Sequence, residues 1–138
     1  MKGFEVFDLS GDLGLRIFGE SLDDLFVSAA LGFYSSVTDP GKILVKTEIG
    51  VSLEEESLEA LLVAWLNELI YLLDAEGFLC KYVDVKSVSQ RHLVADLHGE
   101  PFDAVRHECG LLVKAATYHG LSVLYDGGTW KATVILDL

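Results

Sequence analysis

Three oxygen-bearing side chains occur at alternate positions near the start of the sequence, at Asp8, Ser10 and Asp12. A hard divalent cation is held by several oxygen ligands at about 2.3–2.6 Å, so this spacing is typical of a calcium-binding loop. The later ligands and the closing glutamate of an EF-hand are missing, which excludes that motif. The structural alternative is a turn in which the short polar side chains bond their own backbone.

A second group of carboxylates stands at the other end of the sequence. Asp137 is the penultimate residue, and Leu138 adds a free carboxylate and a backbone carbonyl. Together with Asp12 these groups would form three negative charges, if the early turn and the last strand meet. A bound divalent cation would relieve the repulsion among them. Spacing cannot show the contact, and the alternative is a solvated acidic tail.

The histidines are the other titratable candidates. His119 lies between two strand-like stretches, and His107 lies in an expected loop. A lone histidine is more often a hydrogen-bonded structural residue than a base or a ligand. One alternative function is nevertheless a small metal-dependent hydrolase with His119 as the general base beside a metal at Asp12. We interpret His92 and His98 as surface positions.

The charge balance restricts the partners. The sequence has 22 acidic and 10 basic residues, a formal net charge of −12. Nucleic-acid binding requires clustered Lys and Arg for phosphate contacts, and the bases here are scattered, so we expect no direct nucleic-acid binding. A cation, a basic protein partner or both fit better, and a plain acidic interaction module is a further alternative. Phosphate-binding, metalloprotease and serine-hydrolase motifs are all missing.

The remaining composition predicts a cytoplasmic protein that does not cross a membrane. No apolar run approaches the roughly 18–20 residues that a membrane-spanning helix needs, and the start of the sequence turns acidic too early for a secretory signal. Cys80 and Cys109 are far apart in the sequence. We therefore expect neither a zinc site nor a disulfide, and both thiols should pack as small hydrophobes.

The elements that would position these residues follow from hydrophobic periodicity. Residues 22–33, with Ser21 as N-cap, and residues 58–73, capped by Ser52 or Ser57, have helical spacing. Strand patterns cover residues 4–7, 13–18, 43–49, 79–85, 93–97, 113–118, 121–125 and 129–136, with a hairpin turn at 126–128. We predict a single α+β domain over residues 1–138, in which two helices pack on one face of a mixed, mainly antiparallel sheet.

Read together, several segments resemble the archease family. They are, in family order, Ser10-Gly11-Asp12-Leu13-Gly14-Leu15, Trp65-Leu66-Asn67-Glu68-Leu69, Gly99-Glu100-Pro101-Phe102-Asp103, Arg106-His107-Glu108, Val113-Lys114-Ala115, Thr117-Tyr118-His119-Gly120-Leu121 and Ile135-Leu136-Asp137-Leu138. Each is weak alone, and the ordered set is specific. One departure concerns the first loop, where Leu9 stands in place of the histidine that the family usually has. Any role of that imidazole therefore does not carry over.

The resemblance implies a function. Archeases promote guanylylation and turnover of the tRNA-splicing RNA ligase in a metal-dependent way, so this ligase is the expected partner and a tRNA methyltransferase is a second candidate. The family's metal site maps to Asp12, Asp137 and Leu138, with calcium as the expected ion. The resemblance also leaves Asp8, Ser10, His107, Lys114 and His119 as candidates for partner binding or an accessory role. These implications agree with the carboxylate pattern and predict a non-catalytic accessory protein.

Overall fold

The computed structural model describes residues 3–110 and 112–138. Its elements in chain order are β1 (Phe4–Leu9), β2 (Asp12–Gly19), α1 (Leu22–Val37), the 3-10 turn η1 (Pro40–Lys42), β3 (Thr47–Glu54), α2 (Leu58–Glu76), β4 (Phe78–Val88), β5 (His92–Pro101), β6 (Ala115–Asp126) and β7 (Thr129–Asp137). Neither helix in these described residues is both long and apolar enough to cross a bilayer.

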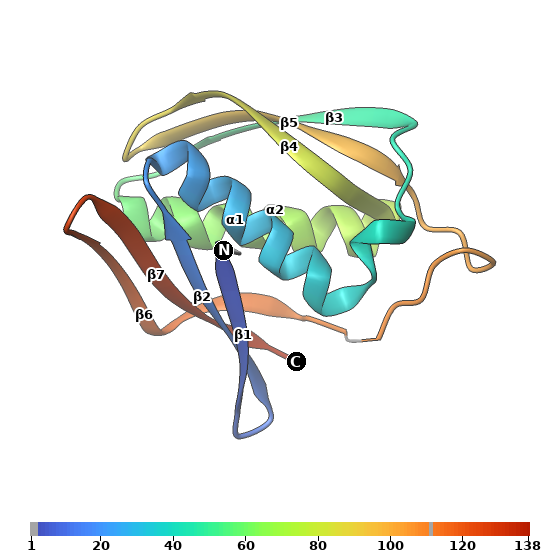
Figure 1. Cartoon of the computed structure of the whole chain (residues 1–138), viewed down its shortest axis with the longest axis horizontal. Coiled ribbons are helices and arrows are strands. Elements are labelled where there is room, and N and C mark those ends of the chain that lie inside the picture. Colours follow the sequence, from blue (N-terminus) through green and yellow to red (C-terminus); the bar gives the residue numbers. More distant parts are fainter. Residues whose placement is uncertain (1–2, 111) are drawn as a thin grey trace.

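The strands form two sheets, one of four strands in the order β1-β2-β7-β6 and one of three strands in the order β3-β5-β4. Every pairing in both sheets is antiparallel. Helices α1 and α2 lie between the two sheets and contact both of them (Figure 1). The α+β class with two helices is confirmed, whereas the single mixed sheet of the prediction is instead two antiparallel sheets. The two sheets share no strand, and residues 102–114 lead the chain from one to the other.

The helices form where their capping residues and apolar periodicity predict. Ser21 caps α1, because its hydroxyl accepts the backbone N–H of Asp24 at 3.2 Å. Ser57, and not Ser52, caps α2 in the same way. The second helix ends at Gly77, whose φ of 64° is the left-handed conformation that favours glycine. The caps therefore confirm the predicted starts of both helices.

The core lies between the sheets. Leu13, Leu15 and Ile17 on β2 are buried, as their alternation predicts. The indole N–H of Trp65 on α2 donates to the carbonyl of Phe26 on α1 at 2.9 Å, so the two helices are also joined by a buried hydrogen bond. Because the buried residues of β2 face the helices, the alternate residues of this strand face outward, on the side that carries the first acidic candidate.

Two details of the strands differ from the prediction. The strand expected over residues 43–49 begins at Thr47, and the segments 113–118 and 121–125 form one bulged strand, β6.

The two cysteines differ in burial. Burial raises the pKa of the Cys80 thiol to about 12, as expected for a packed, unreactive cysteine. Cys109, however, is exposed, so its expected burial is wrong.

Candidate functional site

The β1–β2 hairpin holds the first group of candidate residues. Leu9 and Asp12 form its last pair, and the two residues between them, Ser10 and Gly11, have φ values of 46° and 91°. Positive φ at both positions is typical of the tight turn whose twist suits a β-hairpin. Asp12 is thus the first residue of β2, fixed by hairpin geometry and not by a long flexible loop.

Strand pairing brings the two ends of the sequence together. Leu13 on β2 pairs with Leu136 on β7, so the next residues along this ladder, Asp12 and Asp137, lie on neighbouring strands. Both point to the face of the four-stranded sheet that is turned away from the helices, because the buried Leu13 and Leu136 take the opposite face. Directly opposed side chains on one face have Cβ atoms about 4.5–5.5 Å apart.

Strand β6 supports the same position from the other side. Ala115 pairs with Asp137, and the backbone N–H of Lys114 donates to the carbonyl of Asp137 at 2.7 Å. The side-chain amide of Asn67 on α2 accepts from the backbone N–H of Ala116 at 2.8 Å and donates to its carbonyl at 3.4 Å. Helix α2 therefore holds β6, and through it the end of β7, in a fixed register.

The donor chemistry at this sheet end fits a hard cation. Asp12 and Asp137 contribute carboxylates, the predicted third ligand is the carboxylate of Leu138, and oxygen is the ligand that calcium prefers. Within residues 3–110 and 112–138, no ion pair engages the side chain of Asp12 or Asp137. Across the same residues, no three His, Cys, Asp or Glu side chains form a metal-binding group. The candidate set differs because its third member is a main-chain carboxylate.

The other candidates from the first loop do not join this set. Asp8 pairs with Leu13 and so takes the opposite face of the hairpin from Asp12. Ser10 stands at the exposed tip of the turn. Leu9, which replaces the family's usual histidine, is paired with Asp12 on the same outward face and is 41% exposed. Leu9, where this sequence differs from the family pattern, therefore lies directly beside Asp12.

Another carboxylate, that of Glu100 on β5, lies away from this set and is almost fully buried, at 1% exposure. The guanidinium of Arg106 binds both of its oxygens, the backbone N–H of Leu44 donates to it at 2.6 Å, and the Lys46 ammonium lies 3.6 Å away. The bidentate Arg106 contact holds the pKa of Glu100 well below its usual range, although burial alone would raise it. We call these residues, together with His107, the Glu100 cluster.

His107 completes this cluster and is 3% exposed. Its Nδ1 accepts the backbone N–H of Asp103 at 2.8 Å, and its Nε2 lies 3.0 Å from a Glu100 oxygen. Since Nδ1 accepts, the proton must be on Nε2, which donates to the carboxylate. His107 is thus a structural residue that closes the loop after β5, in line with the structural alternative for a lone histidine.

His119 and Lys114 lie on or next to the edge strand β6. His119 is exposed within the bulge that interrupts pairing between Thr117 and Ser122. Lys114 is exposed and adjoins the carboxylates through its backbone bond to Asp137. Lys114 is thus joined through its backbone to the backbone of Asp137, whereas His119 lies in the exposed bulge.

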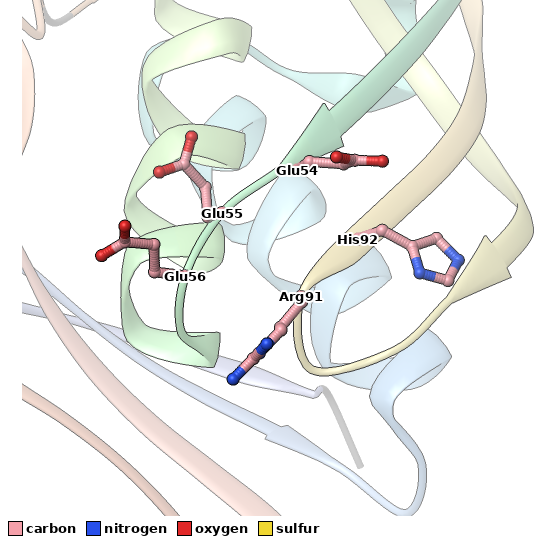
Figure 2. A pocket seen from close by; sticks show the side chains of 5 residues that line it. All are labelled: Glu54, Glu55, Glu56, Arg91 and His92. Atoms are coloured by element: carbon pink, nitrogen blue, oxygen red, sulfur yellow. The ribbon is translucent and has the colours of Figure 1, made fainter.

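An acidic depression occurs where the β3–α2 connection meets the β4–β5 turn. Its lining side chains, Glu54, Glu55, Glu56, Arg91 and His92, point in different directions and do not converge on one point (Figure 2). The backbone N–H of Glu55 donates to the carbonyl of Arg91 at 2.9 Å. The ring nitrogens of His92 are occupied by the hydroxyls of two nearby serines at 2.7 and 2.8 Å. This arrangement resembles a solvated surface and not a catalytic site.

Two contacts that hold the structure around the candidate site are not predicted by the sequence patterns. They are made by Glu100 and Asn67, which lie within the segments of family resemblance. Asn67 carries a usable signal, because a polar amide next to the apolar stripe of a helix needs hydrogen-bond partners. For Glu100, Arg106 and His107 are only six and seven residues away in the sequence, but its Leu44 partner is 56 residues away and could not be predicted.

Comparison with known proteins agrees with this fold. The model of the archease protein family (MTH1598/TM1083) matches residues 4–138. Protein archease of Pyrococcus furiosus is 34% identical over 143 residues, and the match covers 100% of both chains. The solution structure of protein 1598 from Methanobacterium thermoautotrophicum is 35% identical, with a TM-score of 0.84 and 100% of each chain covered.

A crystal structure from Thermotoga maritima, described as an archease and possible chaperone, is 20% identical with a TM-score of 0.66. That match covers 97% of this chain and 96% of the other, and at this identity it shows the shared fold alone. The family match over nearly the whole sequence and the relative at 34% identity carry the assignment further: this chain belongs to the archease family.

Proposed function

We propose that this chain is a non-catalytic activator, or chaperone, of the tRNA-splicing RNA ligase that promotes guanylylation and turnover of that enzyme. Asp12, Asp137 and the carboxylate of Leu138 hold a divalent cation, with calcium as the expected ion. The observation that carries the proposal is the β2–β7 register, which gives the two aspartates one face at the end of neighbouring strands. When bound, the ion supplies the positive charge that balances these carboxylates.

The chain's own charge explains how such a protein would meet its partner. A net charge of −12 repels free RNA and favours approach to a basic surface, such as the mouth of an enzyme that binds RNA and a nucleotide. Lys114 adjoins the carboxylates and is the nearest candidate for an accessory contact with the ligase or its nucleotide. A tRNA methyltransferase is a second candidate partner for the same acidic surface.

Guanylylation of the purified ligase tests the proposal. Wild-type chain should stimulate the reaction, and Asp12→Ala or Asp137→Ala should abolish the stimulation because each removes a ligand. Asp126→Ala is the matched control, since it removes an exposed aspartate from the β6–β7 hairpin with the same change of net charge. Undiminished stimulation by both folded aspartate variants would remove the carboxylates from the mechanism.

The role of the final carboxylate needs a different variant. Adding one glycine after Leu138 moves the terminal charge by about 3.3–3.6 Å and leaves the Leu138 side chain, which packs against the core, unchanged. We expect this extended chain to keep its melting temperature and lose most of its stimulation. Full stimulation by the extended chain would show that the terminal carboxylate is not a ligand.

A further inference from the structure

A small apolar pocket lies between the end of α2 and the loop that follows β5. It has a volume of about 220 Å³, and its lining residues are Leu73, Asp74, Gly77, Phe102, Cys109, Leu112 and Val113. Small-molecule sites usually measure about 300–1,000 Å³, so this pocket is better suited to one large side chain than to a metabolite. The candidate metal ligands Asp12, Asp137 and Leu138 do not line this pocket.

The loop beside the pocket exposes apolar side chains to an unusual extent. Leu112 is 82% exposed, Phe102 is 41% exposed, and Val105 in the same loop is 93% exposed. Grouped exposed apolar residues next to a concave site are typical of a surface that a partner covers. In a chain with a net charge of −12, this is a place where burial of apolar area can contribute to binding.

The pocket is held in shape before any partner arrives. The backbone N–H of Phe102 donates to the carbonyl of Gly77 at 2.6 Å, and that of Gly110 donates to Val37 at 2.9 Å. The ring of Phe102 lies 5.9 Å from the ring of the buried His107. The Glu100 cluster therefore anchors the start of this loop, and a preordered surface reduces the entropy lost on binding.

Charge around the pocket indicates which side chains would bind there. Asp74 and Glu76 are exposed in the last turn of α2, which contains no basic residue, and the end of a helix adds partial negative charge. Among residues 3–110 and 112–138, neither acid takes part in an ion pair. The rim therefore favours an apolar side chain that is flanked by Lys or Arg.

The pocket is linked to the candidate carboxylates through the backbone. Val113 lines the pocket, and the backbone of the next residue, Lys114, binds the carbonyl of Asp137. Residues 102–110 and 112–114 lead from the end of β5, the central strand of the three-stranded sheet, towards β6 and the C-terminus (Figure 1). One partner surface could therefore cover both the pocket and the carboxylates.

We infer that this pocket is a docking site for the RNA ligase and binds a large apolar side chain of the ligase that is flanked by basic residues. The inference rests on the proposed function for the identity of the partner. It assigns to the pocket the affinity for the ligase, and it leaves the stimulation of guanylylation to the carboxylates.

Affinity of purified ligase for the chain tests the apolar part. Leu112→Ser removes the exposed leucine of the pocket. It should raise the dissociation constant about tenfold, as at other binding hot spots. Leu124→Ser is the matched control, because Leu124 is 61% exposed on β6 and does not line the pocket. The control should bind as the wild type does.

A charge reversal tests the rim. Asp74→Lys should weaken binding of the ligase and make that binding less dependent on salt concentration. The variant should fold, because a lysine near the C-terminal end of a helix is stabilising. Asp126→Lys makes the same change of net charge at the β6–β7 hairpin and should have the smaller effect. If the two charge reversals weaken binding equally, the ligase is attracted by the net charge of the chain, and a specific role of the acidic residues beside the pocket is overturned.

The outcomes separate the two proposals. Wild-type affinity in Leu112→Ser and Asp74→Lys, with the ligase still stimulated, would overturn the docking site alone. Tight binding by Asp12→Ala without stimulation supports the division of roles between pocket and carboxylates. A ligase that neither binds the wild type nor responds to it would overturn the proposed function, and the docking site with it.

Discussion

The buried acid Glu100 and the group formed by Asp12 and Asp137 differ in how their negative charge is balanced. Glu100 is 1% exposed and is surrounded by Arg106, His107 and a backbone N–H. Asp12 and Asp137 lie side by side at the end of β2 and β7, and none of the described residues forms an ion pair with them. Both groups belong to segments of family resemblance, yet only the second has oxygens free for a ligand.

This difference distinguishes a structural acidic residue, which is paired inside the protein, from a candidate functional one, which is not. A buried charge with all its hydrogen bonds satisfied stabilises the particular arrangement around it, and removal of one partner leaves the others uncompensated. Adjacent charges without a counter-ion cost stability in the folded chain. We therefore expect the two groups to respond in opposite directions when their charge is removed.

The largest effect should come from Glu100→Gln. The amide cannot accept both Arg106 hydrogen bonds, and its NH₂ group would face that guanidinium or the Leu44 N–H. We expect a fall of several degrees in the melting temperature, measured by circular dichroism. A variant as stable as the wild type would show that the cluster does not hold the loop.

At acidic pH, the difference in stability between the wild type and Glu100→Gln should become smaller. Because the folded-state pKa of Glu100 lies below its ordinary value of 4.5, its contribution to stability is complete above about that pH. The contribution is lost as the pH falls from there towards the lower folded-state pKa. Denaturant unfolding at several pH values should show the wild type and Glu100→Gln converging below pH 4.5, and a constant gap would contradict the assignment.

A smaller loss is expected from His107→Leu. Leucine preserves apolar volume, but the backbone N–H of Asp103 loses its acceptor and Glu100 loses one donor. We expect the free energy of unfolding to fall by about 1–3 kcal/mol, the usual cost of an unsatisfied buried polar group. Equilibrium unfolding in urea measures it, and His119→Leu on the exposed bulge should stay within about 0.5 kcal/mol of the wild type.

The smallest effect, with the opposite sign, belongs to Asp137→Asn. In the presence of a chelator, removal of one of two facing charges should raise the free energy of unfolding by about 0.2–1 kcal/mol. Asp126→Asn should leave it unchanged. A stability loss in Asp137→Asn without metal would mean that Asp137 has a structural partner, as Glu100 does.

Local sequence patterns predicted the parts of the fold that depend on neighbouring residues. The alternation of Leu13, Leu15 and Ile17 predicted the buried face of β2, and Ser21 predicted the start of α1. The division into two sheets was not predictable in this way, because a strand pattern does not specify its partner strand. Only the long-range register decides that β7 joins β2 and that β5 joins β3.

The same limit applies to the site. Spacing identified Asp12 and Asp137 as candidates, but their shared face depends on pairing between strands at opposite ends of the sequence. The full Glu100 cluster could not be predicted, since Arg106 and His107 follow Glu100 closely but Leu44 and Lys46 come from a distant stretch of the sequence. Cys109 is apolar by type, so sequence alone favoured burial over its observed exposure.

Calorimetric titration of calcium tests the central claim most directly. The wild-type chain should bind one ion, and Asp12→Asn and Asp137→Asn should each lose that binding, whereas Asp126→Asn should keep it. Magnesium in a parallel titration would show whether the site prefers the larger ion. Calcium binding of equal affinity in all four proteins, or in none of them, would contradict a metal site at the meeting point of β2 and β7.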